Sequence, residues 1–251
     1  MIIIKTSQQI EGIRKSSKLA VQTLQHTAKF IAPGISTLAL NDIAHKYILD
    51  HHAIPASLNF QGFPKSICTS VNDVVTHGIP SAKVVLKQGD IINLDITTIL
   101  NGYFGDVSAT FPVGKIDKKL SNLITRVRES LDLSIKNLKP GKYLNDCVGK
   151  IIDPYLTNFG YSVVRDLGGH GVGLKFHEDP FVFHFDTGKS GPILKPGMTL
   201  AIEPMINMSP NWQVVLDKDA WTIRTIDGSP SCQFEHTVLI TKTGYEILTV
   251  L

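Results

Sequence analysis

The chain has 251 residues, of which 43% are apolar and 19% charged, and its formal net charge is +3. This composition is ordinary for a globular protein; it excludes an intrinsically disordered chain, and so small a charge gives no reason to expect a sequence-specific nucleic-acid partner. No apolar run is long enough for a secretory signal or a membrane span, which predicts a cytoplasmic protein with no membrane partner.

Each half of the sequence opens with the pattern of an amphipathic helix. Ser7 can cap the first, whose apolar positions are Ile10, Ile13, Leu19, Val21 and Leu24. The run ends before a Pro-Gly pair at 33 and 34, which precedes a second helical pattern within residues 30–49. We therefore predict two helices joined by a Pro-Gly turn.

The three cysteines carry a separate expectation. Cys68, Cys147 and Cys232 are odd in number, widely separated and without a C-x-x-C pair. This pattern predicts reduced, buried thiols and not a disulfide framework or a zinc ribbon.

Residues 92–111, INLDITTILNGYFGDVSATF, read as a β-hairpin. Asn101-Gly102 is the dipeptide that best tolerates the two positive φ angles of a type I′ turn, and β-branched and aromatic residues flank it. A two-residue turn there pairs Thr97 with Asp106, and Asp95 shares the face of Thr97 because side chains alternate along a strand. The two carboxylates are thus predicted to be diagonal neighbours on one face, where they repel unless a cation lies between them.

The second half repeats the first. Leu-Lys-x-Gly, followed by an apolar strand and an acid, occurs at residues 86–95 and 194–203, and Pro140-Gly141 repeats the earlier Pro-Gly pair at nearly the same spacing. Asp117 can cap a helix whose apolar positions are Leu120, Leu123, Ile124, Val127, Leu131 and Leu138. We predict one α+β domain, residues 1–251, made of two related halves (about 1–115 and 116–251), with antiparallel sheet from both halves and helices on one face.

Three further residues resemble metal ligands: Glu203 ends a strand-like run, Glu235 lies within another, and His170 follows two glycines. Taken singly, each has an ordinary explanation as a solvated acid or a turn residue. Together with the hairpin aspartates the acids carry a charge of −4, which two divalent ions would neutralise. Carboxylates with one imidazole suit Mn, Fe(II), Co or Zn, and a paired site of this kind lowers the pKa of a shared water toward about 7. The pattern therefore points to a hydrolase.

Five segments together resemble a known family. They are VNDVVTHGIP (71–80), the hairpin (92–111), GGHGVGLKFHEDP (168–180), LKPGMTLAIEPM (194–205) and QFEHTVLI (233–240). In order and spacing they are similar to the type I methionine aminopeptidases of metallopeptidase family M24. The resemblance implies the pita-bread fold and removal of the initiator methionine from nascent chains near the ribosome, with a preference for a small second residue.

The resemblance also implies roles for individual residues. Asp95 would chelate one ion, Asp106 and Glu235 would bridge two, and His170 with Glu203 would complete the other. His77 would assist the leaving nitrogen and His177 would donate to the substrate carbonyl, while Glu203 would take a proton from the attacking water. Without the resemblance, both histidines read as loop residues.

By the same resemblance, the slot for the methionine side chain is lined by Ser57, Phe60, Phe63, Phe176 and Trp221. Aromatic walls suit the polarizable thioether of methionine, although spacing alone would place these aromatics in an ordinary core. Phe60, Gln61 and Phe63 stand where many bacterial relatives carry titratable residues, which makes the entrance more apolar.

Two other functions compete with this one. A proline-specific aminopeptidase of the same fold usually carries a large extra N-terminal domain, whereas the first helix here begins within ten residues of the start. A member of the fold that has lost catalysis and only binds RNA or protein partners is disfavoured because all five ligands and both histidines are present.

Overall fold

The computed structural model describes residues 1–250. Its N-terminal part contains two helices. Helix α1 (Ser7–Ala28) and helix α2 (Thr37–Asp50) are joined by the predicted turn. The start of α1 differs from the prediction, because Thr6 and not Ser7 is its N-cap. Thr6 Oγ1 accepts a hydrogen bond from the Gln9 amide at 3.3 Å, and Gln9 Oε1 accepts one from the Thr6 amide at 2.9 Å. This reciprocal pair needs a glutamine or glutamate three residues after the cap, which only Thr6 has.

The predicted hairpin is confirmed. Strand β4 (Ile91–Leu100) pairs antiparallel with β5 (Tyr103–Pro112), and Thr97 lies opposite Asp106. Asn101 and Gly102 have φ angles of 52° and 81°, the two positive values that a type I′ turn requires. The register follows from this turn.

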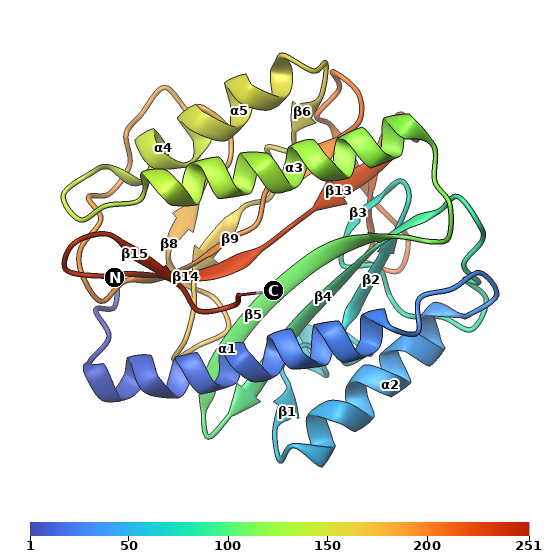
Figure 1. Ribbon diagram of the computed structural model, residues 1–251, viewed down its shortest axis with the longest axis horizontal. Helices are drawn as coiled ribbons and strands as arrows, with labels where there is room; N and C mark the ends of the chain where they lie inside the picture. The colour runs from blue at the N-terminus through green and yellow to red at the C-terminus, as the bar shows by residue number, and fades with distance from the viewer. Residues whose placement is uncertain (251) are drawn as a thin grey trace.

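Helix α1 lies across this hairpin and packs on both of its strands (Figure 1). The packing is close enough that a Cβ built on Gly105 would overlap the backbone of Ser16 and Ser17, so this position in β5 requires glycine. Strands β1 (Ile54–Pro55) and β2 (Cys68–Val71) both pair with β4. The short 3₁₀ helix η1 (Phe60–Gly62) lies between β1 and β2 in the chain.

The C-terminal part repeats this order of helices before strands. Helix α3 (Lys118–Asn137) starts at Asp117 as predicted, with the Asp117 carboxylate accepting from the Leu120 amide at 2.8 Å. Helices α4 (Leu144–Cys147) and α5 (Gly149–Thr157) follow. The next sheet has the strand order β15-β14-β9-β7-β8. Its strands are β7 (Gly169–Gly171), β8 (Glu178–Val182), β9 (Thr199–Ile202), β14 (His236–Ile240) and β15 (Tyr245–Ile247).

Two smaller sheets complete the described strands. One has the order β13-β10-β6, with β6 (Ser162–Val163), β10 (Met205–Asn207) and β13 (Ser231–Gln233). The other has the order β11-β12-β3, with β3 (Val74–Thr76), β11 (Val214–Leu216) and β12 (Ile223–Thr225). Because β3 comes from the first half of the chain, this sheet mixes strands of both halves.

The repeated sequence motifs make matching hydrogen bonds. The Gly34 amide donates to the Leu86 carbonyl at 2.8 Å, and the Gly141 amide donates to the Leu194 carbonyl at 2.9 Å. The return bonds also match, since Leu86 donates to Ile35 and Leu194 donates to Lys142. These equivalent contacts favour the predicted division into two related halves.

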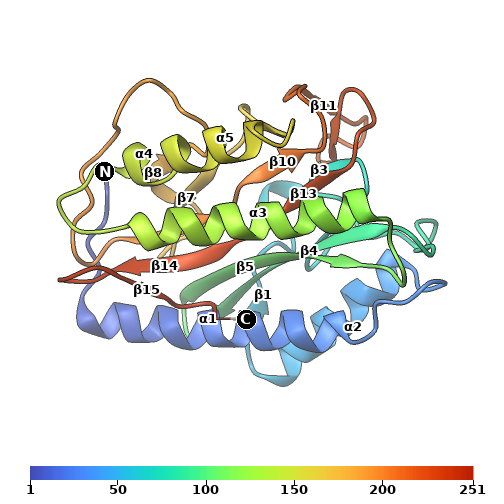
Figure 2. The same cartoon turned by 45° about the horizontal axis from the view of Figure 1, so that its top comes forward.

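The two halves meet where β5 lies beside β14. The Glu235 amide donates to the Ser108 carbonyl at 2.9 Å, and the Thr237 hydroxyl donates to the Asp106 carbonyl at 2.8 Å. Figures 1 and 2 show α1 and α3 on the same side of these strands, and one hydrophobic core extends under both helices. The α+β class with helices on one face of antiparallel sheets is therefore as predicted. Among the described residues, every helix is too short or too polar to span a membrane.

Candidate metal centre

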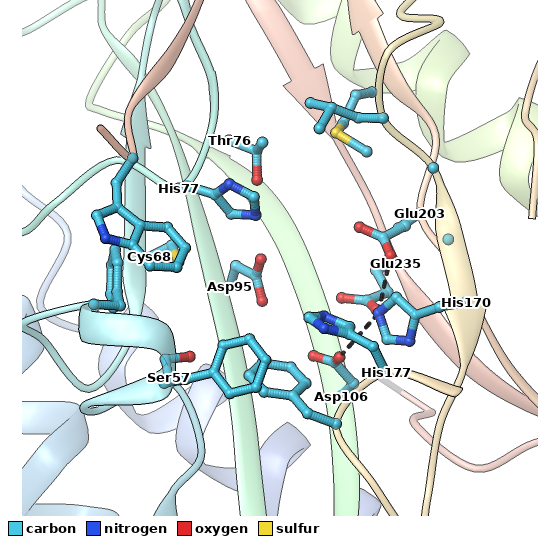
Figure 3. Close-up of a pocket in the computed structure, with 18 of the residues that line it drawn as sticks. Ser57, Cys68, Thr76, His77, Asp95, Asp106, His170, His177, Glu203 and Glu235 are labelled. Atoms are coloured by element: carbon cyan, nitrogen blue, oxygen red, sulfur yellow. Dashed lines mark ion pairs between the residues drawn. The ribbon is translucent and has the colours of Figure 1, made fainter. Parts of the chain in front are cut away.

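Five side chains from different strands converge where the halves meet (Figure 3). Their positions are Asp95 in β4, Asp106 in β5, His170 in β7, Glu203 directly after β9 and Glu235 directly before β14. Ligand atoms of Asp106, His170 and Glu235 all lie within 4.8 Å of one another. His170 Nε2 is 3.4 Å from Glu203 Oε1 and 3.8 Å from Asp106 Oδ2. The structure thus brings the sequence-predicted ligands from both halves into one group.

Burial makes this group of acids unfavourable without cations. Burial raises the pKa of Asp106 to about 7. Burial also raises the pKa values of Asp95, Glu203 and Glu235 well above their ordinary range, and the neighbouring carboxylates of the group raise these three further. Such a group is stable only with bound protons or cations. The donor set therefore fits divalent metal ions.

His170 is oriented as a metal ligand. Burial lowers its pKa to about 3, so its imidazole is neutral at pH 7. Its Nδ1 lies 2.9 Å from the Gly171 carbonyl oxygen, which only accepts, so Nδ1 carries the proton. The Nε2 lone pair consequently faces the carboxylates of Asp106 and Glu203, a repulsive arrangement that a cation between them makes favourable.

We expect divalent ions to stabilise the chelator-treated protein more at pH 7.5 than at pH 5. Because the folded metal-free protein binds protons at these carboxylates more tightly than the unfolded chain does, their contribution to stability is fully present below about pH 4, near their ordinary pKa. This contribution is lost as the pH rises toward 7. Cations replace those protons. At saturating Mn²⁺, binding worth about 3 kcal/mol would raise the melting temperature at pH 7.5 by roughly 5–10 °C. Melting curves with and without Mn²⁺ at both pH values measure this, and equal shifts at the two would contradict it.

His77 and His177 line the same cavity. His77 follows β3 at a φ of 55°, a strained value for a residue with a side chain, and such strain is frequent at functional sites. Burial, and secondarily the charge of His177, lowers the pKa of His77 to about 4. Burial also lowers the pKa of His177, whose ring centroid is 4.3 Å from that of His170. His77 is thus neutral at pH 7 and can donate a hydrogen bond.

An aromatic cavity of about 370 Å³ adjoins the acids. It is lined by every sequence-predicted site residue, including Ser57, Phe60, Phe63, Phe176 and Trp221. The rings form two walls: Phe60 is 4.8 Å from Phe176, and Phe63 is 5.2 Å from Trp221, centroid to centroid. The cavity therefore joins an apolar slot to the charged group.

Four further residues complete the surroundings and were not among the predicted site residues. Cys68 lies opposite Asp95 in the sheet and lines the cavity, where burial raises its pKa and keeps the thiol protonated. Thr97 Oγ1 donates to Asp106 at 2.6 Å. Gln233 Nε2 donates to Glu203 Oε2 at 3.0 Å, and His184 Nε2 accepts from the Glu203 amide at 3.0 Å. The hairpin register could have identified Thr97, and the alternation of exposed and buried residues over 181–184 places His184 on the buried side of the segment after β8.

The three thiols are free and buried as predicted, and His236 lies outside the group of acids. His236 Nδ1 lies 3.1 Å from Thr249 Oγ1, so this histidine does not join its neighbour Glu235 at the acids.

A buried ion pair fixes the loop that carries His177. Lys5 Nζ is 2.6 Å from Glu178 Oε2, and both side chains are 1% exposed. Glu178 Oε1 also accepts from the amides of Leu174 and Lys175 at 2.7 and 3.0 Å. Residues near the N-terminus thus hold a loop that closes the cavity.

Replacing Lys5 by methionine should lower the free energy of unfolding by about 3–5 kcal/mol, because Glu178 would stay buried without its cation. Denaturant unfolding measures this. Lys46→Met is the matched control, since the Lys46–Asp50 pair is exposed and its loss should cost less than about 0.5 kcal/mol. Equal effects of the two variants would contradict the assignment.

Comparisons with known proteins agree with this geometry. The model of metallopeptidase family M24 matches residues 11–242. The chain is 49% identical to a methionine aminopeptidase of Buchnera aphidicola over 98% of its own length and 93% of that protein's. It is 44% identical to methionine aminopeptidase 2 of Mycobacterium tuberculosis, covering 99% of this chain and 86% of that one. The crystal structure of methionine aminopeptidase from Rickettsia prowazekii superimposes with a TM-score of 0.96 at 45% identity, with both chains covered completely.

Proposed function

The chain belongs to metallopeptidase family M24 and is a methionine aminopeptidase of the pita-bread fold, and from this premise we propose that the cavity between its halves is the active site. The observation that carries the proposal is the convergence of four acids and one imidazole in one cavity beside an aromatic slot. As a hydrolase, the enzyme processes the N-termini of polypeptides. Proline-specific enzymes share the fold at lower identity: the Xaa-Pro dipeptidase from Bacillus anthracis superimposes with a TM-score of 0.79 at 24% identity, and this chain covers 62% of it.

We assign two divalent ions to the five ligands. Asp95 would chelate one ion, Asp106 and Glu235 would bridge the pair, and His170 with Glu203 would complete the second. Four negative charges matched by two ions, and oxygen donors joined by one nitrogen, support this assignment. When bound, Mn, Fe(II), Co or Zn would supply Lewis acidity and make a water molecule more acidic than in bulk solvent.

The chain's own residues would carry the protons. Glu203 would accept a proton from the attacking water. Gln233 holds the Glu203 carboxylate in place, and the hydrogen bond from the Glu203 amide to His184 holds its backbone. His177 would donate to the oxygen of the scissile carbonyl as negative charge develops there. His77 would donate to the departing nitrogen. The neutral state of His77 at pH 7 leaves one ring N–H available for this.

The aromatic walls would select methionine. Phe63 and Trp221 on one side, and Phe60 and Phe176 on the other, offer ring edges and faces to an unbranched thioether. Cys68, at the floor, is a protonated thiol that behaves as a small apolar residue. The proposed substrates are the N-termini of nascent polypeptides in the cytoplasm, met near the ribosome.

A peptide panel tests this function. Met-Gly and Met-Ala peptides should be cleaved at least about tenfold faster than Met-Leu or Met-Phe peptides, because a large second side chain would displace the scissile amide from His77 and His177. Methionine release with and without added Mn²⁺ measures the rates. Equal rates for large and small second residues would reject the preference, and activity on X-Pro peptides alone would reject the function.

A further inference from the structure

A row of phenylalanine side chains runs from the cavity along the end of β8 and the residues that follow it. Phe181 in β8 is 46% exposed and Phe183 is 41% exposed, while the intervening Val182 is buried. Their ring centroids are 4.7 Å apart, and Phe183 is 5.5 Å from Phe185. These three residues, here called the Phe181–Phe185 row, lie on one side of the segment that begins in β8. Phe181 and Phe183 are exposed, and Phe185 is half-buried against the hydrophobic core.

The row begins inside the active-site cavity. Phe181 lines the cavity beside Leu167 and Gly168, and its ring lies directly on Gly168, where an added Cβ would collide with the ring. At the far end the guanidinium of Arg165 lies 5.3 Å from the Phe185 ring and 5.4 Å from the Trp212 ring. The aromatic row therefore extends from the active-site cavity over exposed Phe183 and ends at half-buried Phe185.

Neighbouring exposed aromatic side chains of this kind are typical of interaction surfaces. The rings are 4.7 and 5.5 Å apart, closer than the roughly 6.6–6.8 Å between alternate residues of an extended peptide, so neighbouring rings can contact alternate side chains of a peptide that runs beside them. The proposed substrate is a polypeptide whose chain has to leave the cavity after its second residue. Continuity with the cavity thus identifies the downstream substrate chain as the occupant.

We propose that the Phe181–Phe185 row is a subsite for the third to sixth residues of the substrate polypeptide and favours large apolar or aromatic side chains at alternate positions. This inference rests on the proposed function. The subsite would make the enzyme select substrates by the residues that follow the second one. This selection acts through substrate binding and not through the chemical step. Its effect should therefore appear in KM.

The test compares Met-Gly-Phe-Ser-Phe-Ser with Met-Gly-Ser-Ser-Ser-Ser in the metal-loaded enzyme. We expect a KM about five- to thirtyfold lower for the peptide with phenylalanine, as burial of one or two aromatic side chains predicts, with little change in kcat. In Phe183→Thr the ratio should fall below about twofold, while cleavage of Met-Gly-Ser stays unchanged. Threonine is a good strand former, and Phe183→Tyr should restore the preference.

Phe30→Ser is the matched control, because Phe30 is equally exposed, at 44%, but lies after α1. A wild-type enzyme that cleaves both hexapeptides with the same KM overturns the inference and leaves the proposed function intact. Absence of methionine release from every peptide overturns both. A concentration-dependent dimer of the wild type that Phe183→Thr abolishes would make the row a contact between two copies and would also overturn the inference.

Discussion

Replacing Asp106 by asparagine is expected to abolish turnover, with kcat lower by at least about a thousandfold, or roughly 4 kcal/mol of activation free energy. Asp106 is 3% exposed, has a ligand atom within 4.8 Å of those of His170 and Glu235, and is one of the two residues assigned to both metal ions. Its amide replacement keeps the shape and the Thr97 contact but removes one of four negative charges. Two cations would then share three carboxylates, and we expect the protein to bind about one ion instead of two.

Elemental analysis of the purified variant, together with methionine release from a Met-Gly peptide, measures both effects. Glu235→Gln should behave in the same way because Glu235 has the same proposed bridging role. Asp50→Asn is the control, since this carboxylate is exposed on α2 and paired only with Lys46. A variant at position 106 that keeps two ions and the wild-type rate would show that Asp106 does not bridge.

His77→Ala should lower kcat by about a hundredfold to ten-thousandfold and leave the bound metal unchanged. His77 lies in the cavity with its ring 5.9 Å from that of Trp221, and we assign it to the leaving nitrogen of the substrate and not to a metal ion. Removing it takes away a proton donor and leaves all five ligands in place. In this variant kcat should therefore fall while the metal content stays the same.

His52→Ala provides an unusually close control. His52 also has a positive φ, 58° against 55° for His77, but is exposed at the end of α2. Any backbone effect of exchanging histidine for alanine in this conformation is shared by the two variants, so a difference in kcat reports the imidazole itself. Loss of metal from His77→Ala would show that His77 is a ligand and that the assigned role is wrong.

The hairpin and the pairing of its acids could be predicted because their information is local. One Asn-Gly turn sets the register of twenty residues, and that register alone places Asp95 and Asp106 on one face. The repeated Leu-Lys-x-Gly and Pro-Gly motifs likewise gave the order of helices and strands, since each motif makes its contacts within its own half. Two helix ends differ by one residue: the capping box of Thr6 and Gln9 places the cap of α1 at Thr6, and Leu138, expected in α3, is its extended C-cap.

The rest of the site depends on contacts between distant segments. Nothing in the sequence next to Lys5 indicates a partner at Glu178, and nothing near Gln233 indicates that its amide holds Glu203. Such pairs arise from packing between segments that are distant in the sequence, which no local pattern encodes. For His77, His177 and the aromatic walls, only the family resemblance suggested a function; their meeting in one cavity is a property of the folded chain.

The hydrogen bonds that join β5 to β14 impose an order on how a new molecule matures. Asp95 and Asp106 are synthesised long before Glu235, which belongs to the last strands of the described chain, so a ribosome-bound chain first exposes a hairpin with two facing, unneutralised carboxylates. The proposed cation site can therefore be completed only after nearly all of the chain has been translated.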